Sequence, residues 1–133
     1  MLMILVAGCQ NEYFEEPIPL VPVNFQINVN NPVYLDLHTR GWMYLNDEGV
    51  RGVIVYKRSQ FEYEVMDRNC SFQPNSACAT VDVHPSNLYL IDTCCGSTFD
   101  FDGNPTSGPA YIPLRGYSTR MDGNFLVVTN EAF

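Results

Sequence analysis

Basic residues are scarce in this sequence. Seven lysines and arginines stand against fifteen aspartates and glutamates, so the formal net charge is -8. Such a surface would repel phosphates, and we expect no nucleic acid as a partner. The sequence also lacks a phosphate-cradling glycine loop, a serine nucleophile motif, an internal repeat and a low-complexity tract. It therefore predicts no catalytic residue.

Helical periodicity is also missing, and an alternation with period two takes its place. Between positions 21 and 29, apolar residues alternate with Asn24, Gln26 and Asn28, a pattern that is typical of a half-buried strand. Further strands are predicted at 33–37, 42–45, 52–57, 61–67, 80–83, 88–92, 97–101, 117–120 and 124–129, with turn signals at 46–49 and 122–123. The length of 133 residues suits one core. The sequence predicts one all-β domain of small stacked antiparallel sheets over 21–133.

The first residues form a short apolar run that ends in Leu5-Val6-Ala7-Gly8-Cys9. This run resembles the lipobox of bacterial lipoproteins, in which the signal is cut before a cysteine that becomes lipidated. The resemblance implies a signal remnant at 1–8 and lipidation of Cys9. No positive n-region precedes the run, so we expect the true start upstream. The run is too short for a spanning helix of about 20 residues. The alternative is a buried first strand with a core cysteine.

The segment 9–20 is predicted to be a lipidated tether. It has no helical or strand period, and Pro17 and Pro19 favour extended backbone. Its acidic residues resemble the signals that send lipoproteins of Bacteroides-like bacteria to the cell surface, although an ordinary solvated tether is an equal alternative. We expect an anchor in the envelope of a Gram-negative bacterium, at the outer membrane or the cell surface.

A long motif lies in the second half of the chain, between Cys94 and Leu114. It runs Cys94-Cys95-Gly96-Ser97, Thr98-Phe99-Asp100-Phe101, Asp102-Gly103, Gly108-Pro109-Ala110 and Pro113-Leu114. This order resembles a Rieske-type 2Fe-2S domain, where Cys-Pro-Cys-His-Gly-Ser leads into a Phe-Asp strand, an Asp-Gly turn and a Gly-Pro-Ala loop. The resemblance covers about 67–130 and implies the Rieske fold, with a two-loop cluster-type subdomain at about 67–114. Gly96 is expected to let its backbone approach another loop closely.

The residues at the implied ligand positions do not suit iron. A Rieske centre uses two cysteine thiolates on one iron and two imidazoles on the other. The resemblance places the four ligand positions at Cys70, Phe72, Asp92 and Cys95. Phe72 has no lone pair, and Asp92 offers a hard carboxylate where a soft thiolate is expected. His38 and His84 lie outside both boxes and are interpreted as surface or turn histidines. We expect neither a metal nor a cofactor, and we interpret the four positions as vestigial.

Four cysteines lie in the two loops, at Cys70, Cys78, Cys94 and Cys95. An even number of cysteines in an exported chain points to disulfides. The resemblance to respiratory Rieske proteins implies a bond between Cys78 and Cys94. Cys70 and Cys95 are then left to close a second bond at the former iron positions. From the residues alone, all three pairings stay open.

The sequence therefore predicts a non-catalytic exported lipoprotein domain with a structural or interaction role and an unknown protein partner. One alternative is an electron-transfer protein with an atypical 2Fe-2S cluster on Cys70 and Cys95, completed by Asp92, Cys78 or Cys94. Another is a structural zinc ion on the four cysteines, against which an oxidising compartment argues. The aromatic residues Trp42, Tyr44, Tyr56 and Tyr63 are interpreted as strand packing. The basic residues Arg51, Lys57, Arg58 and Arg68 are interpreted as solvated charges, and Asp100 and Asp102 as part of a strand and turn.

Overall fold

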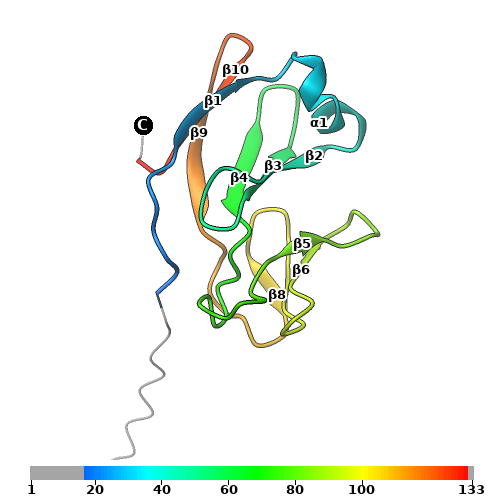
Figure 1. The fold of residues 1–133 in the computed structure, drawn as a ribbon. Helices are drawn as coiled ribbons and strands as arrows, with labels where there is room; N and C mark the ends of the chain where they lie inside the picture. Colours follow the sequence, from blue (N-terminus) through cyan, green and yellow to red (C-terminus); the bar gives the residue numbers. More distant parts are fainter. Residues whose placement is uncertain (1–16, 132–133) are drawn as a thin grey trace, which may run out of the picture.

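The protein is described by a computed structural model that covers residues 17–131 and contains two antiparallel sheets (Figure 1). The six-stranded sheet has the order β1-β10-β9-β4-β3-β2, with β1 (Asn24–Asn28), β2 (Trp42–Leu45), β3 (Val53–Lys57), β4 (Tyr63–Asp67), β9 (Gly116–Asp122) and β10 (Phe125–Thr129). The four-stranded sheet has the order β5-β6-β7-β8, with β5 (Asp82–Val83), β6 (Leu90–Ile91), β7 (Thr98–Phe99) and β8 (Pro105–Ser107). The predicted all-β class with stacked antiparallel sheets is confirmed.

Strands β3 and β4 are buried on both faces, because each lies between two hydrophobic cores. In β3, Val53 and Val55 point into a core shared with β1, β9 and β10, whereas Ile54 points into a second core formed with the four-stranded sheet. In β4, Val65 belongs to the first core and Met66 to the second. The period-two geometry of a strand sends neighbouring side chains to opposite faces, so these two strands join the sheets into one structure.

The predicted strand at 33–37 is wrong. This segment forms the 3-10 helix η1 (Pro32–Tyr34) and the short helix α1 (Asp36–Thr39). Pro32 suits the first helical position, and the side chain of Asn31 caps the turn by accepting from the backbone N–H of Val33 at 3.1 Å. Only Leu37 of these helices is buried, and it fills the first core.

Strand β8 was not predicted; it is an edge strand of three exposed or half-buried residues. It is held to β7 partly by hydroxyl groups, since Thr98 Oγ1 lies 2.7 Å from Thr106 Oγ1 and 2.6 Å from Ser107 Oγ. The predicted turn at Asp102-Gly103 is present between β7 and β8, where Asp100 accepts from the backbone N–H groups of Asp102 and Asn104, both at 2.9 Å.

The segment before β1 follows the side of the molecule towards the four-stranded sheet (Figure 1). Arg115 Nη2 donates to the carbonyl of Ile18 at 3.0 Å, and Asn130 Nδ2 donates to the carbonyl of Val21 at 3.2 Å. Over 17–131, no helix has the length and apolar character needed to cross a membrane. The signal remnant, Cys9 and most of the tether lie outside the described residues, so the division at 8 and 20 stays a prediction.

Candidate functional site

Two loops face each other at the end of the four-stranded sheet. The first follows β4 and carries Cys70, whose backbone N–H donates to the carbonyl of Ala79 at 2.9 Å. The second joins β6 to β7 and is closed by two backbone bonds, from Asp92 N to Ser97 O at 2.9 Å and from Gly96 N to Asp92 O at 2.7 Å. Both loops are therefore shaped by their own main chain.

The backbone of Gly96 and Ser97 does approach another loop closely, but the glycine that permits this approach is Gly108. A Cβ atom at Gly108 would lie 2.6 Å from Ser97 Cα, whereas one at Gly96 would meet no atom within 4 Å. Gly108 also has a φ of +84°, which glycine adopts without strain. This glycine brings the Gly-Pro-Ala segment against the second loop, where the backbone N–H of Ala110 donates to Ser97 Oγ at 3.0 Å.

A disulfide joins the two loops, between Cys78 and Cys94, with a Cα–Cα distance of 5.9 Å. This pairing confirms the one that the family resemblance implied. The bond excludes both residues as metal ligands, so neither a zinc ion on four cysteines nor a cluster completed by Cys78 or Cys94 matches the structure.

The second expected disulfide is absent, and Cys70 and Cys95 are free thiols. The Cys95 thiol is directed towards other partners, with its Sγ 3.4 Å from Asp92 Oδ2 and 3.1 Å from Ser97 Oγ. Asp92 in turn accepts from the backbone N–H of Cys94 at 2.8 Å. The carboxylate thus holds the Cys95 thiol in a hydrogen-bonded position, and the predicted bond between Cys70 and Cys95 has to be corrected.

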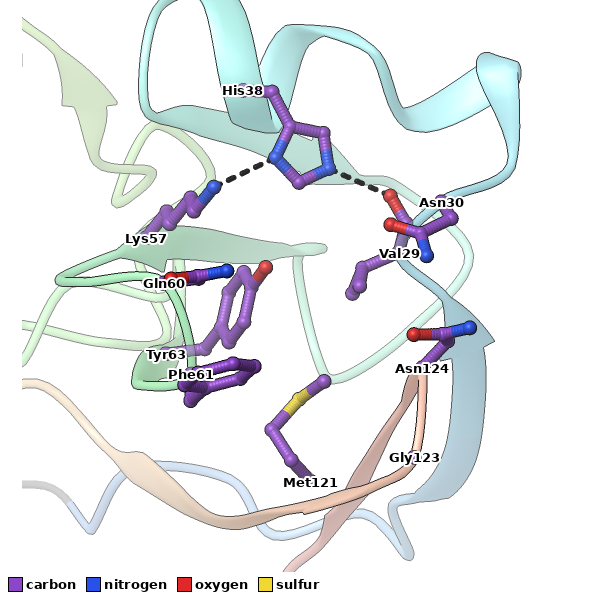
Figure 2. Close-up of a pocket in the computed structure, with 10 residues that line it drawn as sticks. All are labelled: Val29, Asn30, His38, Lys57, Gln60, Phe61, Tyr63, Met121, Gly123 and Asn124. Atoms are coloured by element: carbon purple, nitrogen blue, oxygen red, sulfur yellow. Dashed lines mark hydrogen bonds between the residues drawn. The ribbon is translucent and has the colours of Figure 1, made fainter.

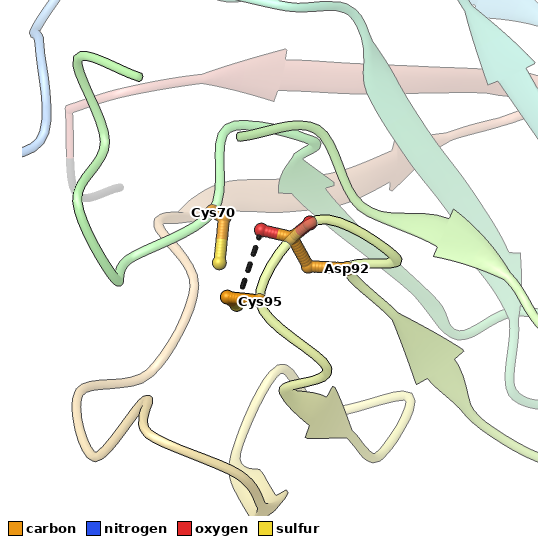
Figure 3. A group of neighbouring side chains, drawn as sticks. All are labelled: Cys70, Asp92 and Cys95. Atoms are coloured by element: carbon orange, nitrogen blue, oxygen red, sulfur yellow. Dashed lines mark hydrogen bonds between the residues drawn. The ribbon is translucent and has the colours of Figure 1, made fainter. Parts of the chain in front are cut away.

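Cys70, Asp92 and Cys95 nevertheless form a compact group, with one potential ligand atom from each lying within 4.8 Å of the others (Figure 3). Cys70 and Asp92 are buried and Cys95 is half-buried. The partners of the carboxylate are the backbone N–H of Cys94 and the thiols of Cys95 and Cys70, none of which carries positive charge. A buried carboxylate between two thiols is an arrangement that a soft or borderline cation would stabilise.

The Cys70 thiol is expected to be a poor nucleophile in this structure. Burial raises its pKa far above the ordinary range, and the hydrogen bond and negative charge of Asp92 raise the pKa further. Since the thiolate is the nucleophile and the metal ligand, a protonated Cys70 reacts slowly until a cation displaces its proton.

The residues at the four ligand positions do not fit a Rieske 2Fe-2S cluster. Phe72 is half-buried and packs against the second core with Cys95, so a hydrocarbon ring stands where an imidazole is needed. His84 stacks on Tyr89 with ring centroids 4.2 Å apart, and its Nδ1 bonds to Ser86 Oγ at 2.8 Å. His38 bonds to Val29 and Lys57. The donors that the two loops bring together are two thiols and one carboxylate.

Sequence reasoning missed the residues that support the first loop. Arg51, interpreted as a solvated charge, donates to three carbonyls of the first loop: Pro74 at 3.0 Å, Ser76 at 2.6 Å and Ala77 at 3.1 Å. Three bonds to backbone oxygen make this guanidinium a structural clamp, because its planar fork presents several donors at fixed angles. Its partners lie more than twenty residues away, so no local pattern could have indicated them.

Asp67, at the end of β4, is a second unforeseen support. Its buried carboxylate accepts from Val50 N at 2.7 Å, Asn69 N at 2.9 Å and the Tyr117 hydroxyl at 2.7 Å. Burial raises the pKa of Tyr117 above its usual range, with the hydrogen bond to Asp67 as a further cause, so the phenol stays a donor. These bonds fix the start of the Cys70 loop on the six-stranded sheet.

The protein has the Rieske fold. Its small antiparallel sheets are curled, and a disulfide joins the two loops that face each other. The structure is similar to that of the cyanobacterial plasma membrane Rieske protein PetC3 from Synechocystis PCC 6803, with a TM-score of 0.56, 22% identity, and coverage of 82% of this chain and 98% of that chain. A second similar structure is the ferredoxin of carbazole 1,9a-dioxygenase from Nocardioides aromaticivorans IC177, with a TM-score of 0.47, 20% identity, and coverage of 68% and 86%. No protein-family model and no curated protein sequence matches the chain.

Proposed function

We propose that this protein is an exported lipoprotein whose Rieske-like domain has lost its iron ligands and has a non-catalytic structural or interaction role at the cell envelope. The observation that carries the proposal is the pair of residues at the ligand positions, Phe72 and Asp92, together with the half-buried packing of Phe72. The disulfide between Cys78 and Cys94 supports it further, because it holds the two loops together without any metal. A lipid anchor at Cys9 would attach the domain to a membrane, where an unidentified protein is the expected partner.

The location rests on two supports. The end of the apolar run resembles a lipobox, and the similar protein PetC3 is described as a plasma membrane Rieske protein. The acidic segment after Cys9 favours the outer membrane or cell surface of a Bacteroides-like bacterium.

Iron analysis of protein purified from the envelope without exposure to air tests the loss of the cluster. We expect a colourless protein without iron or acid-labile sulfide, since two of the four ligands are missing. The triple variant Phe72→His, Asp92→Cys, Cys95→His restores the ligands of the family and serves as the positive control. The absorption spectrum of a 2Fe-2S cluster in the natural protein would reject the proposal.

The anchor is tested by Cys9→Ser in a chain that carries a complete signal. The natural protein should partition into detergent, because several acyl chains on one residue give stable anchoring, and the variant should stay soluble or unprocessed. Gln10→Ala, which leaves the lipobox intact, is the matched control. Equal partitioning of the natural protein and Cys9→Ser would end the lipoprotein proposal.

A mononuclear zinc site is the second candidate, and the grouping of Cys70, Asp92 and Cys95 favours it. Zinc binds cysteine sulfur at about 2.3 Å and carboxylate oxygen at about 2.0–2.2 Å, which places two ligand atoms of a tetrahedral site about 3.5 Å apart. Cys95 Sγ and Asp92 Oδ2 already lie 3.4 Å apart, and all three ligand atoms lie within 4.8 Å of one another. Elemental analysis should then find one zinc ion per chain, lost in Asp92→Asn and kept when Cys78 and Cys94 are both replaced by alanine. A metal-free natural protein that does not bind added zinc would exclude this candidate.

A further inference from the structure

A second site lies at the opposite end of the six-stranded sheet from the cysteine loops. It is a cavity of about 290 Å³ between the end of β1, helix α1, strands β3 and β4, and the β9–β10 hairpin (Figure 2). Small-ligand pockets usually start at about 300 Å³, so the cavity suits a molecule at the small end of that range. The share of one water in the liquid is about 30 Å³, which makes the cavity equal to roughly ten waters.

The charge of the lining is unlike that of the rest of the chain. The sequence contains fifteen acidic residues and one lysine, Lys57. Lys57 lines this cavity, and none of the other nine lining residues is acidic. In a protein with a net charge of -8, the lining of this cavity therefore contains one cationic side chain and no acidic one.

Lys57 is held in place by a neighbouring histidine. Its Nζ lies 2.8 Å from His38 Nδ1, and His38 Nε2 lies 2.7 Å from the carbonyl oxygen of Val29. An ammonium group only donates and a carbonyl only accepts, so Nδ1 accepts from Lys57 and Nε2–H donates to Val29. The bond to His38 holds the ammonium group at the wall of the cavity and uses one of its three N–H groups, which leaves two for another acceptor.

Tyr63 places a second donor, without a hydrogen-bond partner, in the wall of the same cavity. Its side chain is 5% exposed, and its buried hydroxyl has no hydrogen-bond partner among residues 17–131. Figure 2 shows the hydroxyl pointing into the space enclosed by the labelled side chains. Burial raises the pKa of Tyr63, so the group stays an O–H that needs an acceptor.

The remaining walls are largely apolar. Val29, Phe61 and Met121 line the cavity, and Phe61 is 68% exposed at its rim. An exposed aromatic ring beside a concave site is a favourable contact for the apolar part of a ligand.

We propose that this cavity binds a small organic monocarboxylate with an apolar body, such as an aromatic or short aliphatic acid. The Lys57 ammonium and the Tyr63 hydroxyl would donate to the carboxylate oxygens, and the apolar body would lie against Phe61 and Met121. One fixed cation matches one negative charge. The inference does not depend on the proposed function, because the site shares no residue with the cysteine loops.

Binding is tested by titrating the ¹⁵N-labelled full chain with benzoate and with hexanoate, and by following the backbone amide signals of Gln60, Gly123 and Asn124. We expect saturable shifts at these amides with a dissociation constant of about 1 mM or below. Benzamide, which has the same shape without the charge, should bind at least about tenfold more weakly, because hydrogen bonds to charged groups are the stronger ones.

Two variants connect the binding to the named groups. Lys57→Met keeps the length of the side chain and should weaken benzoate binding about tenfold or more, and Tyr63→Phe should weaken it about three- to tenfold. Arg40→Met removes the same charge from the exposed pair with Asp36, and Tyr56→Phe removes a hydroxyl outside the cavity; both should bind as the natural protein does. Tyr63→Phe removes only an unpartnered group, so it should fold normally.

The proposal is overturned if neither acid shifts these amides at about 10 mM, ten times the expected constant. Equal affinities for benzoate and benzamide would also overturn it, as would unchanged binding in Lys57→Met. Zinc and iron contents of the protein have no bearing on these measurements, so failure here is separate from failure of the proposed function.

Discussion

Replacing Cys78 and Cys94 together by alanine should lower the free energy of unfolding by about 3 kcal/mol. The two residues are separated by 16 positions, and closing a loop of this length removes about 10 cal/mol/K of entropy from the unfolded chain. At 25 °C this corresponds to about 3 kcal/mol, a large share of the 5–15 kcal/mol that is typical of a domain. The effect should be larger than that of most single surface changes.

Urea unfolding followed by the fluorescence of Trp42, the one tryptophan, measures this loss. A reductant should destabilise the natural protein by the same amount and leave the double variant unchanged, and a chelator should change neither. Non-reducing peptide mapping should link Cys78 to Cys94 and leave Cys70 and Cys95 alkylated after denaturation. A loss below about 1 kcal/mol, or a reductant effect that persists in the double variant, would refute the reasoning.

Three further predictions concern named contacts. Gly108→Ala should lower the free energy of unfolding by about 2 kcal/mol or more, because its Cβ would lie 2.6 Å from Ser97 Cα. Gly41→Ala, at a φ of +87° with no atom within 4 Å, should lower it by about 1 kcal/mol. Equal losses in urea unfolding would contradict the clash at Gly108. The raised pKa of Tyr117 predicts a free energy of unfolding that is steady below about pH 10 and falls above it, since the unfolded phenol loses its proton first, with a slope of up to about 1.4 kcal/mol per pH unit. Tyr117→Phe should flatten this fall, and an unchanged slope would show that another group causes it. Tyr63→Phe should leave stability unchanged or raise it by up to about 1 kcal/mol, whereas Tyr117→Phe should lower it by about 1–3 kcal/mol at neutral pH, and equal losses would mean that Tyr63 has a partner.

The strands were predictable where packing enforces the period of two. β2 was predicted at its observed bounds, and β3, β4 and β10 lie within their predicted ranges, because their alternate residues face buried cores. The helices at 32–39 were not predictable from period, since a helix of four residues with one buried side chain, Leu37, has almost no periodic pattern to detect. The three-residue strand β8 escaped for the same reason: too few residues alternate.

The cysteine loops were predictable in part. The motif from Cys94 to Leu114 led to the right fold and to the right partner for Cys78. The state of Cys70 and Cys95 depended on a contact that sequence does not contain, namely the position of the Asp92 carboxylate beside the Cys95 thiol.

The cavity around Lys57 could not have been predicted from the sequence. His38, Lys57 and Tyr63 each looked ordinary in the sequence, as a surface histidine, a solvated lysine and a strand tyrosine. They come from helix α1, the end of β3 and the start of β4, and only the folded chain brings them to one cavity. Because the proposed binding site combines single residues from three separate segments, it has no continuous sequence motif.

The course of residues 17–23 shows from which side of the molecule the chain before β1 arrives. This segment leaves β1 towards the four-stranded sheet, and the bond from Arg115 to Ile18 holds it there (Figure 1). At about 3.3 Å per residue, the eight steps along the chain from Cys9 to Pro17 reach about 26 Å. If Cys9 is lipidated as proposed, the tether would therefore join the domain on the side of the cysteine loops. The cavity around Lys57 lies at the other end of the six-stranded sheet.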